Sequence, residues 1–288
     1  MWQITQLVTV MKIFCQRLIF YLFFTSIFYV PFAQTLPPGG MTNWEINGVE
    51  EIVTFALFDP KSPGIQLPPG LKFIPASAIR MPQVIEYLKE HPKYSDWAFS
   101  IIEITKQKGF IIDGRALEAK KDGAIGLWLA PVDASNLSEK IPAEAFNKII
   151  KPSLDAALAL GVWVPDKEYV AYMKSKGHYG EYGNVTMTMD SAGIYRGEIR
   201  LDNLVIKNTA SPLKGEEKDP TAGTQLMFSA GSEVQSTIVL SGSGAVHRNC
   251  KAEWKMTGSH PLSKAVLVGP TYLTTYEKPL KGSLYKLK

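Results

Sequence analysis

Short segments in which apolar and polar positions alternate follow one another through the second half of the chain. Residues 185–189 and 194–201 alternate in this way, and the Asp-Ser-Ala-Gly sequence between them has the composition of a turn. Segments of similar character follow at 204–207, 224–230, 233–241, 244–256 and 264–276. Closely spaced strands joined by Gly and Asp or Asn turns are typical of all-β folds. The pattern therefore predicts a closed or nearly closed antiparallel β-barrel or sandwich.

The first half of the chain adds further strands and a few short helices to this prediction. Runs rich in aromatic and β-branched residues predict strands at 49–58, 97–105, 110–113 and 124–130. A helix is predicted over 81–91, because Pro82 suits its first turn and Pro92 would stop it. The expected fold class is then mainly β, formally α+β, with a few short helices.

Three further segments lack the two-residue period. Residues 143–160 are rich in Ala and Leu and are interrupted by Pro152, and Gly161 stands where a cap would end a helix. We expect a second helix over this segment, followed by one or two helical turns over 166–174. The polar stretch 208–223 is expected to be a loop.

The first 34 residues contain no acidic residue, and Lys12 and Arg17 are their only charges. The 13 residues after Arg17 are uncharged, and Ala33 stands just before a polar stretch. A basic start, a short apolar run and a small residue are typical of a secretory signal. A membrane span needs about 20 consecutive apolar residues, and this run is shorter. We expect residues 1–33 to be a signal peptide, and the protein to be secreted or periplasmic and to meet the membrane only during export.

The start and the cleavage point of this signal each have an alternative. Met11 is a second candidate start, because it gives a more ordinary signal length. An uncleaved signal anchor is the alternative to cleavage after Ala33. The Pro- and Gly-rich stretch that comes next predicts a linker over residues 34–48, and residues 49–288 are expected to form a single domain.

Charge and cysteine content exclude several classes of function. Without the signal, the formal net charge falls from +4 to +2, which gives no broad positive field for nucleic acid or anionic lipid. Cys250 is the only cysteine after the signal, so no internal disulfide is expected. The four histidines lack the spacing of a metal site, and the glycine-rich segments read as turns. We expect no metal, no cofactor and no nucleic-acid partner.

The segment 171–179 carries two lysines, Lys174 and Lys176, close to His178 and between tyrosines. In an extended segment, residues two apart point to the same side, so the two amines would lie close together. Neighbouring cations and burial both disfavour the charged ammonium form. A lysine that is neutral near pH 7 can attack a carbonyl carbon and form a Schiff base. The alternative is a solvated lysine pair on a surface loop.

Three stretches of the chain resemble the acetoacetate decarboxylase-like superfamily. Residues 67–75, Leu-Pro-Pro-Gly-Leu-Lys-Phe-Ile-Pro, are similar to the family's entry to its first long strands. Residues 171–177, Ala-Tyr-Met-Lys-Ser-Lys-Gly, are similar to its Ala-Tyr-Pro-Lys-Lys-Leu-Gly around the Schiff-base lysine. The strand near 246–256, the loop through Pro261 and the closing strands to Lys288 resemble the family's C-terminal part.

The resemblance implies a divergent, exported β-barrel that acts as a lyase on a small keto acid or a related carbonyl compound. Lys174 would form the imine, and Lys176 would lower its pKa, because Ser175 stands where the family has its second lysine. Glu103 would move protons during the reaction. The residues that would line the substrate pocket are Trp97, Phe99, Trp128, Trp163 and Tyr172.

Two other functions remain open at this point. The first is a barrel of the same fold that binds an apolar or carbonyl-bearing small molecule without turnover. The second is a structural or surface-interaction sandwich, which the all-β pattern and the polar stretch 208–223 favour. Assembly into a homo-oligomer is compatible with each of the three functions.

Overall fold

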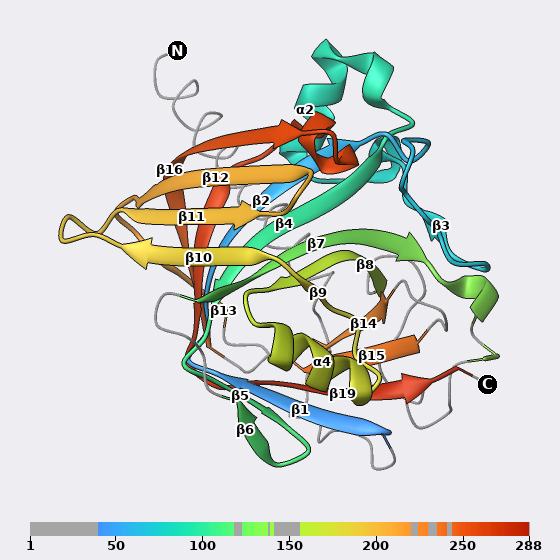
Figure 1. Cartoon of the computed structure of the whole chain (residues 1–288). Helices are drawn as coiled ribbons and strands as arrows, with labels where there is room; N and C mark the ends of the chain where they lie inside the picture. The colour runs from blue at the N-terminus through green and yellow to red at the C-terminus, as the bar shows by residue number, and fades with distance from the viewer. Residues whose placement is uncertain are drawn as a thin grey trace.

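The structure is a computed structural model, and it describes residues 40–117, 123–137, 139–140, 156–219, 224–229, 235–240 and 244–287. The expected signal, 1–33, and residues 143–155 of the second predicted helix lie outside these ranges. Figure 1 shows the arrangement of the strands and helices. The strands are β1 (Thr42–Asn47), β2 (Glu50–Phe58), β3 (Lys72–Phe73), β4 (Ala98–Lys106), β5 (Gly109–Ile112), β6 (Arg115–Leu117), β7 (Ala124–Asp133), β8 (Ala156–Val164), β9 (Glu181–Tyr182), β10 (Asn184–Met189), β11 (Tyr195–Arg200), β12 (Leu204–Pro212), β13 (Glu217–Asp219), β14 (Thr224–Ser229), β15 (Gln235–Leu240), β16 (Ala245–Gly258), β17 (Val266–Leu267), β18 (Thr271–Tyr276) and β19 (Leu280–Lys286). The helices are α2 (Pro82–Glu90) and α4 (Lys167–Ser175), with short 3-10 turns at Ala76–Ala78, Pro92–Tyr94, Ser135–Leu137 and Pro261–Lys264.

Strands β2, β4 and β7 form the centre of the fold, with β4 antiparallel to both of its neighbours. A second layer, formed by β10, β11, β12 and the end of β16, packs over one face of these strands (Figure 1). The side chains between the layers are apolar, and Ile52, Ile102 and Ile104 are fully buried there. Their positions alternate with residues of the opposite face, as expected in strands with a two-residue period.

The central sheet continues through β8, β14, β15 and β19 to β1 and curves into a nearly closed barrel (Figure 1). The pairs of β8 with β14 and with β9 are parallel, whereas the other registered strand pairs are antiparallel. The predicted fold class, mainly β with a few short helices, is confirmed. The sheet begins with β1, inside the stretch 34–48 that the sequence predicts as a linker.

Two of the helical predictions are confirmed, and their ends have clear causes. Helix α2 begins at Pro82 and ends before Pro92. Helix α4 begins after Asp166, whose side chain accepts hydrogen bonds from the backbone N–H groups of Glu168 at 2.9 Å and Tyr169 at 3.0 Å. A carboxylate in this position pairs free backbone donors and interacts favourably with the positive end of the helix.

The helix predicted over 143–160 is wrong in its described part, because residues 156–160 begin strand β8. Both faces of β8 are buried, so its Ala and Leu residues pack in the sheet, and this packing outweighs their helical propensity. The loop predicted over 208–223 is also wrong in part, because β12 extends to Pro212 and β13 spans Glu217–Asp219. Polar residues suit both strands, because buried and more exposed positions alternate along β12 and Glu217 and Lys218 of β13 are exposed.

Among the described residues, no helix is both long enough and apolar enough to cross a membrane.

Candidate functional site

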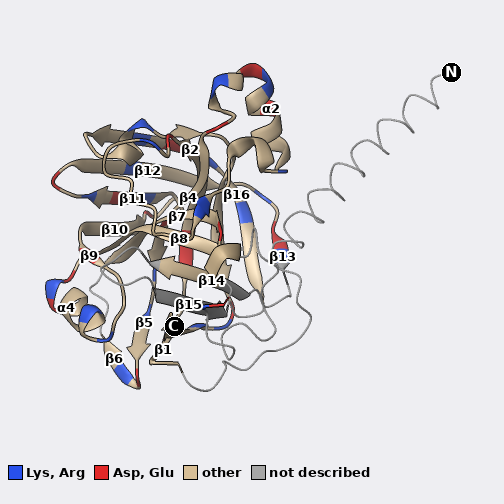
Figure 2. Ribbon diagram, turned by 90° about the vertical axis from the view of Figure 1, so that its right-hand side faces the viewer, with Lys and Arg blue, Asp and Glu red and all other residues tan. Residues whose placement is uncertain are grey.

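Lys174 lies in the last turn of helix α4. This helix lies at the edge of the molecule (Figure 2). The helix buries Tyr169, Val170 and Met173, whereas Lys174 is exposed. The two amines would lie together only on an extended backbone, and this condition is not met, because Lys174 is helical and residues two apart do not face each other on a helix. An exposed side chain is not enclosed by the water-excluding pocket that the Schiff-base role requires.

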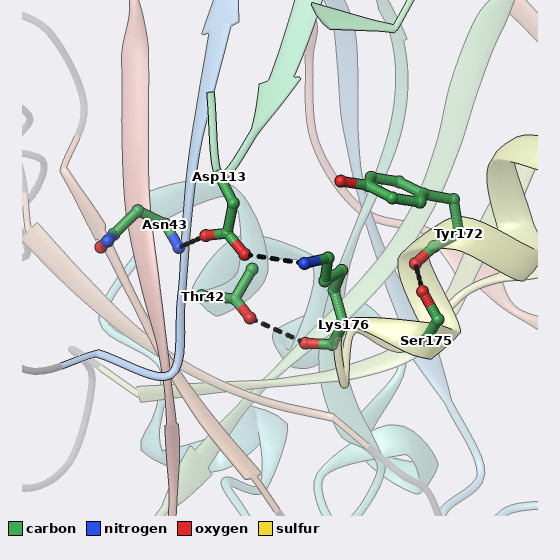
Figure 3. Close-up of polar contacts among 6 residues, drawn as sticks. All are labelled: Thr42, Asn43, Asp113, Tyr172, Ser175 and Lys176. Atoms are coloured by element: carbon green, nitrogen blue, oxygen red, sulfur yellow. Dashed lines mark hydrogen bonds and ion pairs between the residues drawn. The ribbon is translucent and has the colours of Figure 1, made fainter. Parts of the chain in front are cut away.

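Lys176 connects the end of α4 to β1 and to the hairpin turn between β5 and β6 (Figure 3). Its Nζ atom lies 3.3 Å from Oδ2 of Asp113, and its backbone carbonyl accepts a hydrogen bond from Thr42 Oγ1 at 2.9 Å. Oδ1 of Asp113 accepts a hydrogen bond from the backbone N–H of Asn43 at 2.9 Å. Lys176 thus holds α4 in place and does not lie beside Lys174 in a shared pocket.

This arrangement gives different expectations for the two lysines. Lys176→Ala removes a half-exposed ion pair and is expected to lower the free energy of unfolding by up to about 1 kcal/mol. Lys174→Ala should change it by less than about 0.5 kcal/mol, because the side chain lies in solvent. Urea unfolding of both variants measures the difference. A larger loss for Lys174→Ala would contradict the placement of these side chains.

The aromatic residues predicted to line one pocket are found in three separate places. Trp128 and Trp163 are buried between the two layers, where both rings contact His260. Trp97 and Phe99 belong to a cluster that α2 covers, and Phe99 stacks on Phe55 with 5.7 Å between ring centroids.

Tyr172 lies in the third place, on helix α4. The guanidinium of Arg115 lies 4.6 Å from the centroid of its ring, and the Lys176 ammonium lies 5.8 Å from it. The ring therefore packs between two cations near the surface. The five aromatic residues are not brought together around a single substrate.

Glu103 and Glu51 form the polar centre of the fold, and we call them the carboxyl pair. Val53 on β2 lies directly opposite Glu103 on β4, and Glu51 lies directly opposite Thr105. The two glutamates are therefore diagonal neighbours on one face of the sheet, the face turned away from the second layer. Glu51 is 6% exposed, and one of its carboxyl oxygens accepts a hydrogen bond from the Tyr276 hydroxyl at 3.1 Å.

The surroundings of the carboxyl pair favour its protonated form. Burial raises the pKa of Glu103 to about 7. Burial also raises the pKa of Glu51 well above its usual range, the nearby charge of Glu103 raises it further, and the hydrogen bond from Tyr276 acts in the opposite direction. Two carboxylates this close disfavour each other's charge, so the pair retains a proton at neutral pH.

Solvent still reaches this face of the sheet. Glu103 keeps some exposed surface, whereas Ile102 and Ile104 on either side of it in the strand are fully buried against the second layer. Val53 and Leu127, its direct neighbours on β2 and β7, are also partly exposed. Glu103 thus combines dense protein surroundings with accessible surface, which a group that contacts a ligand requires.

The polar residues around the pair extend along the same face. Thr274 lies directly opposite Glu51 on β18, and its hydroxyl is 3.0 Å from Nδ1 of His247. The hydroxyl of Thr105, the residue directly opposite Glu51, is buried and has no hydrogen-bond partner. Buried polar atoms are usually paired, so this orphaned oxygen beside the pair indicates a site that a ligand or water completes.

The sequence identified Glu103 as an inward-facing acid but missed Glu51 and Thr105. One signal was present, because Glu51 directly precedes the largely apolar run 52–58 and Glu103 lies between Ile102 and Ile104. Their proximity depends on the register between β2 and β4, which pairs residues about 50 positions apart in the chain. Among the described residues, no group of three or more His, Cys, Asp or Glu side chains is placed to hold a metal ion.

No protein-family model matches the sequence, and no curated protein matches it. Among solved structures, the chain is similar to an acetoacetate decarboxylase from Legionella pneumophila, with a TM-score of 0.49 and 10% identity over 92% of this chain and 94% of that one. It is also similar to an acetoacetate decarboxylase-like enzyme from Sphingomonas wittichii, with a TM-score of 0.47 and 8% identity over 86% and 92%. The enduracididine biosynthesis enzyme MppR gives a TM-score of 0.44 and 11% identity over 88% of each chain. The description of the site rests on this chain's own residues.

Proposed function

We propose that this protein is an exported β-barrel that binds a small molecule at the carboxyl pair, Glu51 and Glu103. The observation that carries the proposal is the pair itself, two adjacent carboxyl groups on neighbouring strands with raised pKa values and accessible surface at Glu103. A protonated carboxyl group donates a hydrogen bond and its partner accepts one, so the pair offers both to a ligand. Val53 and Leu127 supply apolar contacts beside it.

A Schiff-base lyase that uses Lys174 is the second candidate, and the resemblance of residues 171–177 to the family's lysine motif is what favours it. Against it stands the exposure of Lys174 in the last turn of α4. A Schiff-base lysine is activated in an apolar pocket or beside another cation, and the position of Lys174 offers no such enclosure. Glu103, with its pKa near neutrality, suits proton transfer, but that role requires a substrate held at the carboxyl pair.

Covalent trapping separates the two candidates. The purified protein is incubated with acetylacetone or acetoacetate, reduced with borohydride, and analysed by intact mass and peptide mapping. We expect no more adduct on Lys174 than on Lys167, which lies on the same helix and serves as the internal control. A single stoichiometric adduct on Lys174, absent in Lys174→Ala, would instead establish imine chemistry.

Ligand-observed NMR tests binding directly. A library of small neutral, acidic and basic compounds is screened against the wild type, Glu103→Gln and Lys174→Ala. We expect the compounds that bind the wild type to bind Lys174→Ala equally well and to lose signal with Glu103→Gln. Compounds that bind the wild type and Glu103→Gln but no longer bind Lys174→Ala would overturn the proposal.

A further inference from the structure

We infer that the ligand of the carboxyl pair is a small organic cation, of the class of a primary alkylammonium ion, and not a carboxylate. This inference rests on the proposed function and specifies the charge of the molecule that the site takes. Its basis is the oxygen acceptors around Glu51 and Glu103, and the finding that no described lysine or arginine forms an ion pair with either glutamate.

The charge of the site favours a cation. Two carboxyl groups lie side by side, and among the described residues no lysine or arginine forms an ion pair with either of them. A carboxylate ligand would add a third acidic group to surroundings that already disfavour the ionisation of the first two. An ammonium ion would instead compensate the charge that the pair carries when it ionises.

The hydrogen-bonding groups favour an N–H donor. Thr105 is 4% exposed and lies directly opposite Glu51, so both side chains are on one face, and its hydroxyl has no partner. An ionised carboxylate only accepts hydrogen bonds, and a hydroxyl oxygen accepts them as well. An ammonium group has three donors and no acceptor, and the oxygens of Glu51 and Thr105 complement it.

The remaining neighbours suit the alkyl part of such a molecule. Val53 and Leu127 lie directly opposite Glu103 on either side, and Tyr272 lies directly opposite Val53 on β18. Aromatic rings attract cations, and aliphatic side chains bury methylene groups favourably. The face therefore presents acceptors at one point and apolar surface around it.

Three probes of similar size and different charge test the inference: butylammonium chloride, butyramide and sodium butyrate. Binding of each is measured by NMR titration of the full protein, with potassium chloride at matched concentrations as the ionic-strength control. We expect butylammonium to bind the wild type at least about tenfold more tightly than butyrate. Glu103→Gln should weaken butylammonium about tenfold and butyramide much less.

Glu50→Gln is the matched control variant. Glu50 precedes Glu51 on the same strand, and its side chain points to the other face, so the change removes one charge without touching the site. Thr105→Val is a second site variant that changes no charge, and it should weaken the binding of butylammonium independently of Glu103→Gln. Butyrate that binds as tightly as butylammonium would overturn the inference while leaving binding at the pair intact. If none of the three probes binds, the inference that the ligand is an alkylammonium ion is overturned. The library screen then tests separately whether the carboxyl pair binds any small molecule.

Discussion

Trp163→Ala is expected to lower the free energy of unfolding by about 3 to 5 kcal/mol, the usual cost of removing a large aromatic side chain from a core. Trp163 is 1% exposed and packs between the two layers of the fold, and its ring centroid lies 6.1 Å from that of His260. Urea unfolding measures the loss. Trp97→Ala is the matched control: Trp97 is only partly buried, in the cluster beside α2, and a smaller loss is expected. An equal loss for the two variants would contradict the packing described here.

Three glycines make room for the Trp163 side chain, and they extend this prediction. A Cβ atom at Gly161 would lie 2.3 Å from Cζ2 of the ring, one at Gly126 would lie 3.1 Å from Cε3, and one at Gly183 would lie 3.0 Å from the Trp163 Cβ. Gly161→Ala should therefore destabilise the protein by about 1 to 3 kcal/mol through overpacking. In the Trp163→Ala background the same change should cost much less, because the ring is gone. A double-mutant cycle with no interaction energy would refute this explanation.

Glu103→Gln is expected to stabilise the protein by about 3 kcal/mol at pH 8 and to have little effect at pH 4.5. The folded protein holds the Glu103 proton up to about pH 7, whereas the unfolded chain releases it near pH 4.3. The folded state then binds more protons between these values, so its stability falls as the pH rises through this window. Glutamine has the same shape as glutamate and no charge to desolvate. The loss of stability with rising pH should therefore be smaller in Glu103→Gln than in the wild type.

His178 acts in the opposite direction over nearly the same range. Burial lowers the pKa of His178 to about 4, although the charge of Asp113 acts to raise it. The unfolded chain binds this proton up to about pH 6.5, so His178 makes the protein more stable as the pH rises from 4 to 6.5. His178 therefore opposes the contributions of Glu103 and Glu51, whose raised pKa values both make stability fall as the pH rises. Stability should accordingly fall less with rising pH in Glu103→Gln than in the wild type.

The measurement is urea unfolding of the wild type, Glu103→Gln and the control Glu50→Gln at pH steps from 4.5 to 8. Glu50 lies on the same strand as Glu51 and points to the other face, so its variant should follow the wild-type curve. A constant difference between the wild type and Glu103→Gln over the whole range would show that burial does not shift the ionisation of Glu103.

The mainly β fold and the helices α2 and α4 could be predicted because their signals are local. The two-residue period of 185–201 follows from one face of a hairpin packing on the core and the other facing solvent. Proline at each end of α2 and the Asp166 cap of α4 act through backbone geometry within a few residues. Such signals are present in the chain before it folds.

The candidate site could be predicted only in part. Glu103 was identified as the inward-facing acid of a predicted strand that could take the proton-transfer role implied by the family resemblance. Lys174 and Lys176 were expected to cooperate, and their separation follows from the helical conformation of α4 and from the ion pair of Lys176 with Asp113. The reactivity of a lysine depends on how deeply its side chain is buried. Burial is set by tertiary packing, and a short sequence motif does not determine it.

By itself, the sequence determined the class of fold, the positions of two helices and the alternation that sends Glu103 to one face of its strand. Only the tertiary structure decided that 156–160 is a strand, that Trp163 fills the core and that Glu51 lies beside Glu103. The first group depends on interactions between near neighbours in the chain. The second depends on strand register and packing between distant segments, where burial outweighs local propensity and brings two carboxyl groups together.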